Sequence, residues 1–273
     1  MEDLARRAVE GDSVALDTLL REVMDDVYRL AMRMLGHPAD AEDATQEILV
    51  RVVTNLGSFR GQSAIKTWVW RIAANHLLSV RRGRREPEGI DFERLDGMLT
   101  AGLAMPVGAV NLADDVDRQL LEEEVKLGCT QMMLACLDRP HRLAFILGEV
   151  LQLPGPAAAA ILDLSPAAYR QRLSRARRRL RAFMTASCGL VSDRAACRCR
   201  RQIEPSVAMG LLDPRAPVLA LHPTRATADE AVLRQYRAIE SVASPEEVMR
   251  SHPAYAGPAS LIDRIHAMIA ASP

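Results

Sequence analysis

Seven arginines between residues 170 and 181 form the densest group of side chains in the sequence that could do chemistry. Guanidinium groups bind phosphate oxygens and can form two hydrogen bonds to a guanine edge. So much like charge on a short segment is costly unless a polyanion neutralises it. The segment is therefore predicted to bind nucleic acid, and the alternative is a solvated basic face on an ordinary amphipathic helix.

A helix that begins at Ser165-Pro166 must position these arginines. A Ser hydroxyl can accept a hydrogen bond from a free amide at a helix start, and Pro is favoured at the first helical position. One apolar stripe follows the helix: Tyr169, Leu173, Ala176, Leu180 and Phe183. An Ala-rich helix ends near Leu162, and Asp163 and Leu164 form a short turn before the restart. This order predicts a helix-turn-helix whose second helix enters a major groove.

Residues near the start of this second helix are expected to approach base edges. They are Ala167, Ala168, Arg170, Gln171 and Ser174. Among them, Arg170 and Gln171 are the long donors that can discriminate bases. Phosphate contacts, which give affinity and register, are assigned to Arg172, Arg175, Arg178 and Arg179.

A second basic stretch, from Phe59 to Arg85, interleaves aromatic and cationic side chains. It contains Phe59, Trp68, Trp70, Arg60, Lys66, Arg71 and the cluster Arg81, Arg82, Arg84 and Arg85. Such a mixture suits single-stranded or melted DNA, where bases stack on aromatic rings and cations follow the backbone. Both tryptophans could equally be core residues, and Trp68 taken alone favours burial. The segment begins as a loop and is predicted to become a helix from about Ile65.

An acidic helix precedes this stretch, with Asp40 as its predicted cap. Its apolar stripe consists of Ala44, Ile48, Val52 and Leu56. The spacing leaves Asp40, Asp43 and Glu47 on an exposed face, which is either a solvated surface or a contact for a partner.

Three cysteines, Cys188, Cys197 and Cys199, fall within twelve residues just after the arginine-rich helix. Thiolates this close could bind Zn or Cu(I), with His222 or His252 as a fourth ligand. Incidental thiols and a local disulfide remain open alternatives. Cys129 and Cys136, seven apart in a helical pattern, are predicted to be core residues.

The composition predicts an all-α protein, because 49% of the 273 residues are hydrophobic and only 4% are aromatic. The formal net charge is zero, but basic patches alternate with acidic segments along the chain. No export signal and no run of about 18 apolar residues occur, so a cytoplasmic protein without membrane insertion is expected. We find no catalytic or phosphate-binding motif, so no enzyme is expected and no cofactor is required.

Four parts are predicted along the chain: a helical domain at 1–85, a flexible linker at 86–122, a second helical domain at 123–185 and an extension at 186–273. The extension contains two capping-box starts, at Thr227 and Ser244. After Gly257-Pro258 a last helix is expected, with an apolar side formed by Leu261, Ile262, Ile265, Met268 and Ile269. The extension is therefore predicted to be a small helical unit that packs on either domain or on a partner and controls access to DNA.

Three motifs together resemble one known family. They are D-A-E-D-x-x-Q-E at 40–47, F-R-G-x-S-x-x-K-T-W-x-x-R-I-A-x-N at 59–75 and L-S-R-A-R-R-R-L at 173–180. The first two are similar to region 2 of extracytoplasmic-function sigma factors, and residues 125–184 resemble their region 4 helix-turn-helix. The resemblance covers about two thirds of the chain. It implies a factor that binds core RNA polymerase and directs promoter-specific transcription initiation.

The resemblance also implies roles for individual residues. Docking on the polymerase β′ coiled coil would involve Asp40, Glu42, Asp43, Gln46 and Glu47. Capture of a flipped base of the −10 element would involve Phe59, Arg60, Ser63, Lys66 and Thr67, with Arg71 and Asn75 on the adjoining strand. Region 4 would bind the −35 duplex and the polymerase β flap. The resemblance also implies an anti-sigma factor as a further partner.

The chain departs from the family pattern at three places. Ser79 stands where an Asp is usual, and 156–160 is Pro followed by four alanines where paired Glu residues are usual. The recognition helix opens with Ala167-Ala168 in place of a small hydroxyl residue, so direct base contacts are expected to be few and DNA shape more important. The competing function is a stand-alone helix-turn-helix regulator that does not require core polymerase.

Overall fold

In the computed structural model, residues 1–80, 89–110, 117–222 and 243–270 are described. Within these ranges every regular element is a helix, and the one β-type contact is an isolated bridge between Cys188 and Cys197. The all-α prediction is confirmed. None of the helices in these ranges combines the length and apolar character that crossing a membrane requires.

The N-terminal bundle, residues 1–79, consists of α1 (Glu2–Val9), α2 (Ser13–Leu35), α3 (Pro38–Asn55), the short 3-10 turn η1 (Leu56–Ser58) and α4 (Ile65–Ser79). The predicted start of α4 is confirmed. The predicted cap at Asp40 is wrong, because Pro38 already occupies the first turn and the His37 ring nitrogen accepts from the Ala39 amide at 3.2 Å. Asp40 instead lies in the first turn, where its carboxylate stabilises the helix by interacting favourably with the helix dipole.

The helix-turn-helix unit, residues 118–187, consists of α6 (Arg118–Ala135), α7 (Arg139–Phe145), the π-helical turn η2 (Ile146–Val150), α8 (Gly155–Ile161) and α9 (Pro166–Ser187). Ser165 caps α9 as predicted, its hydroxyl accepting from the Ala168 amide at 3.1 Å. Asp163 adopts a φ of 53° in the turn between α8 and α9. All five residues of the predicted stripe on α9 are buried, so this helix-turn-helix is confirmed.

Further helices lie in the predicted linker and in the extension. Within 86–122, Phe92–Ala104 form α5, whose Phe92 ring packs 5.1 Å from that of Phe183. The extension contains η3 (Cys199–Gln202), α10 (Ile203–Ala208), α12 (Pro245–Arg250) and α13 (Ser260–Ala270). The predicted capping box at Ser244 is present, while the one at Thr227 lies outside the described residues.

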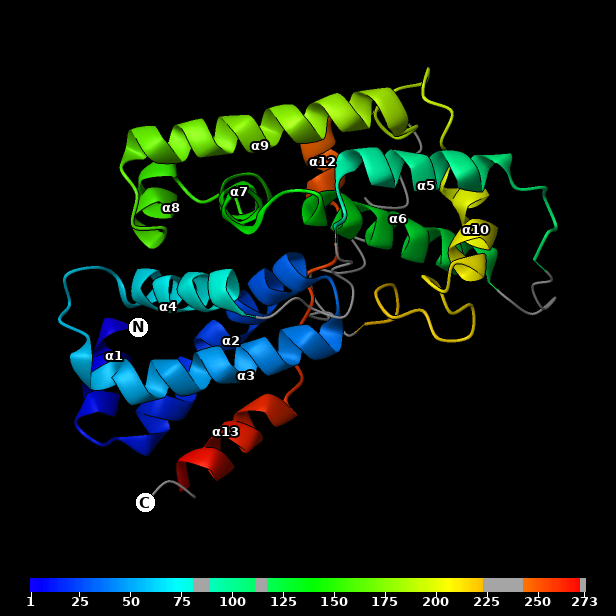
Figure 1. Ribbon diagram of the computed structural model, residues 1–273. Coiled ribbons are helices and arrows are strands. Elements are labelled where there is room, and N and C mark those ends of the chain that lie inside the picture. The colour runs from blue at the N-terminus through cyan, green and yellow to red at the C-terminus, as the bar shows by residue number, and fades with distance from the viewer. Residues whose placement is uncertain (81–88, 111–116, 223–242, 271–273) are drawn as a thin grey trace.

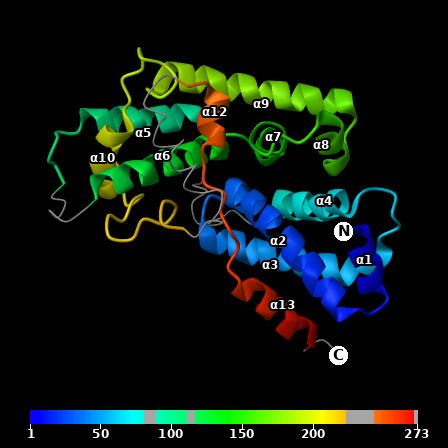
Figure 2. The same ribbon diagram turned by 180° about the vertical axis from the view of Figure 1, so that it is seen from behind.

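The helices stack in layers, with α9 on one side, α7 and α8 beneath it, and then the N-terminal bundle (Figure 1). We call residues 243–270 the C-terminal strap. Seen from behind, the strap starts with α12 beside α9, runs across α2 and ends with α13 at the far side of α3 (Figure 2).

One cluster of buried residues runs through both helical units and the strap, including Leu30, Ile48, Phe145, Leu180 and Ile265. The predicted division into two helical domains suggests a separate core in each. The two cores are continuous because α2 and α4 also contact α7, α4 contacts α8, and α13 contacts α2 and α3.

Candidate nucleic-acid interface

The outer face of α9 carries most of the residues predicted to contact a DNA duplex. Arg170, Gln171, Ser174, Arg175 and Arg178 are exposed, while Ala168 and Arg172 are half-buried. This face is open because Tyr169, Leu173 and Leu180 point into the core on the opposite side of the helix. The arrangement suits insertion into a major groove, with donors near the helix start and cations further along.

Three arginines of the same helix are engaged by other parts of the chain. Arg177 pairs with the buried Glu149, with its Nε 2.7 Å from the carboxylate. Arg181 donates to Glu246 of α12 at 2.6 Å. Arg179, assigned to phosphate from the sequence, lies 4.0 Å from Asp138 and 5.5 Å from the centre of the Phe92 ring.

The loop before α4 carries the residues predicted to meet single-stranded DNA. Arg60 is exposed, and Phe59 and Trp68 are both half-buried with their rings 5.6 Å apart. Trp68 is therefore less buried than its residue type alone suggested, whereas Trp70 lies in the core. The Ser63 hydroxyl donates to the Ala64 carbonyl at 3.4 Å, and Thr67 is half-buried.

Two contacts hold this loop and α4 in place. The Ile65 amide donates to Glu2 of α1 at 3.2 Å, a role for Glu2 that no sequence pattern indicated. Lys66 pairs with Asp26 of α2 at 2.7 Å. Further along α4, Arg71 and Asn75 are exposed on the same helix. The arginine cluster at 81–85 lies outside the described residues.

The predicted polymerase-docking residues lie along α3 with different exposures. Asp43 and Glu47 are exposed, and Asp40, Glu42 and Gln46 are half-buried. The Glu47 carboxylate lies 3.9 Å from Nδ1 of the buried His76. Burial lowers the pKa of His76, so at neutral pH this imidazole does not neutralise Glu47.

Two family models match the chain: Sigma-70 region 2 over residues 19–86 and Sigma-70 region 4 over residues 127–180. RNA polymerase sigma-H factor of Pseudomonas aeruginosa is 30% identical over 180 residues, covering 64% of this chain and 89% of that protein. This chain belongs to the extracytoplasmic-function sigma factors. ECF RNA polymerase sigma-E factor of Escherichia coli is 29% identical, over 64% of this sigma factor and 88% of its own length. The solved structure of CnrH in complex with the cytosolic domain of CnrY covers 66% of this chain and 94% of its own, with a TM-score of 0.47 and 24% identity.

The two matched regions contain all the predicted polymerase and DNA contacts of this sigma factor. The first includes α3, the loop at 59–64 and α4, and the second includes α9 as far as Leu180. The whole extension, with the three cysteines and the strap, lies beyond both matches.

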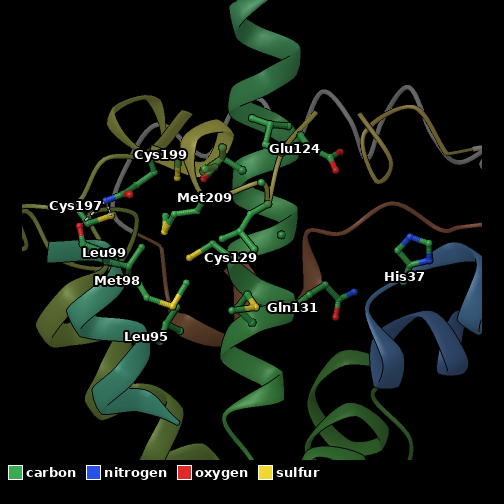
Figure 3. A pocket seen from close by; sticks show the side chains of 18 residues that line it. His37, Leu95, Met98, Leu99, Glu124, Cys129, Gln131, Cys197, Cys199 and Met209 are labelled. Carbon is green, nitrogen blue, oxygen red and sulfur yellow. Dashed lines mark hydrogen bonds between the residues drawn. The ribbon is translucent and has the colours of Figure 1, made fainter. Parts of the chain in front are cut away.

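The three cysteines of the extension gather with a fourth around two neighbouring cavities of the sigma factor. Cys129, Cys197 and Cys199 line a mostly apolar cavity of about 380 Å³ between α5, α6 and the extension (Figure 3). The second cavity, of about 580 Å³, is lined by the same three cysteines and by Cys188. Cys129, predicted as a core residue, is half-buried against the core and also lies beside the other three, whereas Cys136 is buried elsewhere. We call Cys129, Cys188, Cys197 and Cys199 the sulfur cluster.

These thiols are free, and burial raises the pKa of each, that of Cys199 to about 12. Across the described ranges, no three His, Cys, Asp or Glu side chains are grouped to hold a metal ion. The histidines suggested as fourth ligands are engaged elsewhere. His222 lies 2.6 Å from the Tyr28 hydroxyl, and His252 is hydrogen-bonded to Thr130.

Proposed function

We propose that this sigma factor gives core RNA polymerase its promoter choice by binding one stretch of DNA at two places. In this proposal α9 binds the −35 element as a duplex, and the 59–64 loop with α4 holds the opened −10 element. The acidic face of α3 docks on the polymerase. The sigma factor acts by binding and positioning, so no side chain is assigned a catalytic step.

The observation that supports this most is the presence of two separate cationic surfaces on one chain. The exposed donors of α9 suit paired strands, since they follow one face of a single helix. The Phe59 and Trp68 rings beside Arg60 and Arg71 suit unpaired bases and their phosphates. A duplex-binding regulator would need only the first surface.

Run-off transcription with core polymerase on genomic fragments tests the proposal, with start sites mapped on the products. A pull-down with core enzyme separates it from a stand-alone regulator, which would bind duplex DNA tightly without retaining polymerase. Failure to bind core polymerase under any condition, including removal of the strap, would contradict the proposal. A separate anti-sigma partner stays a prediction, and the same pull-down from cells would detect one.

Replacing Arg170 or Gln171 with alanine should reduce discrimination between the cognate −35 element and variants of it. A bidentate contact to a base is worth about 1–3 kcal/mol, which corresponds to roughly 5- to 150-fold. Binding of holoenzyme to promoter fragments with single base changes measures this. As the matched control, Arg178→Ala should weaken binding to all sequences alike and lower the salt dependence by about one charge. An equal loss on every sequence for Arg170→Ala would show that this side chain binds only phosphate.

We also propose that the sulfur cluster binds one thiophilic metal ion, Zn or Cu(I), per chain. The thiols would have to move closer together, since Zn–S bonds are about 2.3 Å long. Because ligation displaces thiol protons whose pKa values are raised, metal uptake should fall steeply as the pH falls. Elemental analysis of the purified chain tests this: Cys197→Ser and Cys199→Ser should lose the metal, and Cys136→Ser should keep it. Wild-type protein without metal after incubation with Zn and with Cu(I) would contradict the proposal.

A further inference from the structure

The last helix, α13, covers part of the face of α3 that is proposed to dock on polymerase. Leu261, Ile262 and Ile265 are fully buried against α2 and α3. Arg264 of α13 lies 3.5 Å from the Glu42 carboxylate, and the Gln46 amide lies 3.1 Å from the sulfur of Met268. Met268, which belongs to the predicted apolar side of this helix, is exposed at the edge of the contact. Two of the five predicted docking residues are thus already occupied from within the chain.

The rest of the strap ties α13 to both helical units. Glu246 of α12 accepts from Arg181 of the recognition helix at 2.6 Å, and Arg33 of α2 donates to the Met249 carbonyl. Beyond α12, His252 is hydrogen-bonded to Thr130 of α6. The Gly257 amide then donates to Asp25 of α2 at 3.0 Å. Two of these contacts are buried and two are half-buried, and together they hold the strap across the junction of the two units.

Direct contacts also join the two units under the strap. Arg142 of α7 is buried and donates to the Met34 carbonyl at 2.8 Å. Arg139 donates to the carbonyls of Leu77 and Val80 at the end of α4. The helix proposed to hold the −10 strand is therefore packed against the unit proposed to bind the −35 duplex.

This packing is incompatible with simultaneous binding of both promoter elements. Their centres are about 25 base pairs apart, which is ~85 Å of duplex at about 3.4 Å per base pair. Surfaces on two units in van der Waals contact cannot span that distance along straight DNA. The exposed face of α9 could still bind a −35 duplex alone, but initiation requires the two units to separate.

We propose that the C-terminal strap is a built-in inhibitor, in which α13 competes with core polymerase for α3 and the preceding residues hold the two units closed. This inference rests on the proposed docking role of α3. Binding of polymerase would then require release of α13. The measured affinity is therefore the intrinsic affinity multiplied by the fraction of molecules in which α13 is released.

Full-length Ile262→Asp/Ile265→Asp tests the competition, because two buried carboxylates would expel α13 from its site. We expect this variant to bind core polymerase at least tenfold more tightly than wild type and to give more run-off transcript. Ala267→Asp, which adds a charge on the exposed side of the same helix, should behave as wild type. Unchanged or weaker polymerase binding by a variant with native helical content would overturn the proposal. Should this variant unfold, deletion of 259–273 takes its place with the same two outcomes.

A cross-linked variant tests the competition from the opposite direction. Gln46→Cys/Met268→Cys places thiols at the two contacting positions, and a short bis-methanethiosulfonate reagent should link them through two disulfides, releasing methanesulfinate, and abolish polymerase binding until dithiothreitol restores it. The two single-cysteine variants control for the five natural cysteines. A cross-linked form that binds polymerase as well as its reduced form would overturn the proposal.

The docking role of α3 is tested separately in the same assay with Asp43→Lys/Glu47→Lys. If this variant loses polymerase binding while the α13 variants match wild type, the inhibition is wrong and the docking face stands. If it binds polymerase normally, the docking face itself is wrong.

Discussion

Replacing Asp43 and Glu47 with lysine is expected to abolish promoter-dependent transcription by this sigma factor. Both carboxylates are exposed on α3, and the Glu47 carboxylate lies 3.9 Å from the buried His76, whose pKa is lowered by burial. Placing like charges across an interface costs several kcal/mol. A cost of about 3 kcal/mol corresponds to a loss of polymerase affinity of about 150-fold.

The measurement is the dissociation constant of the sigma factor for core polymerase, together with run-off transcript yield. Glu93→Lys, an exposed charge reversal on α5, is the matched control and should leave both unchanged. Since the substitutions are on the surface, the free energy of unfolding should change by less than about 0.5 kcal/mol. A double variant that keeps full transcription would show that polymerase docks on another face.

Replacing Tyr169 with alanine is expected to destabilise the helix-turn-helix unit by about 3–5 kcal/mol, a large part of the stability of a small domain. Tyr169 is 2% exposed, and its ring fills the space between α9 and the end of α7. Without the ring, the arginine-covered face of α9 would lose its fixed orientation. Binding to a −35 duplex should therefore fall together with stability.

Tyr169→Phe is the matched variant for this prediction. It keeps the ring and removes only the hydroxyl, which donates to the Ala144 carbonyl at 3.3 Å, so a loss of about 1 kcal/mol is expected. Denaturant unfolding monitored by circular dichroism compares the two. Equal losses for both variants would mean that the hydrogen bond, and not the packing of the ring, holds α9.

Local rules were sufficient for individual elements of this protein. The Ser165-Pro166 start and the spacing of the apolar stripe predicted α9 and its exposed donors, because capping and helical periodicity depend on neighbours within a few residues. The same reasoning located α4 and the capping box at Ser244. It failed at Asp40, since a His at a helix start is a rarer cap than Asp and the helix begins at Pro38, three residues earlier than a cap at Asp40 would place it.

The sequence by itself determined the helical class, the two cationic surfaces and the family, since each depends on residue type and short spacing. Only the tertiary structure decided that Cys129 joins the three later cysteines, and that Arg181 pairs with Glu246. It also decided that α13 lies on the acidic helix of the N-terminal bundle. These contacts join residues 59 to more than 200 positions apart, and an apolar helix face specifies that it must be covered without specifying by what. The strap packs where it does because the two folded units leave those surfaces exposed.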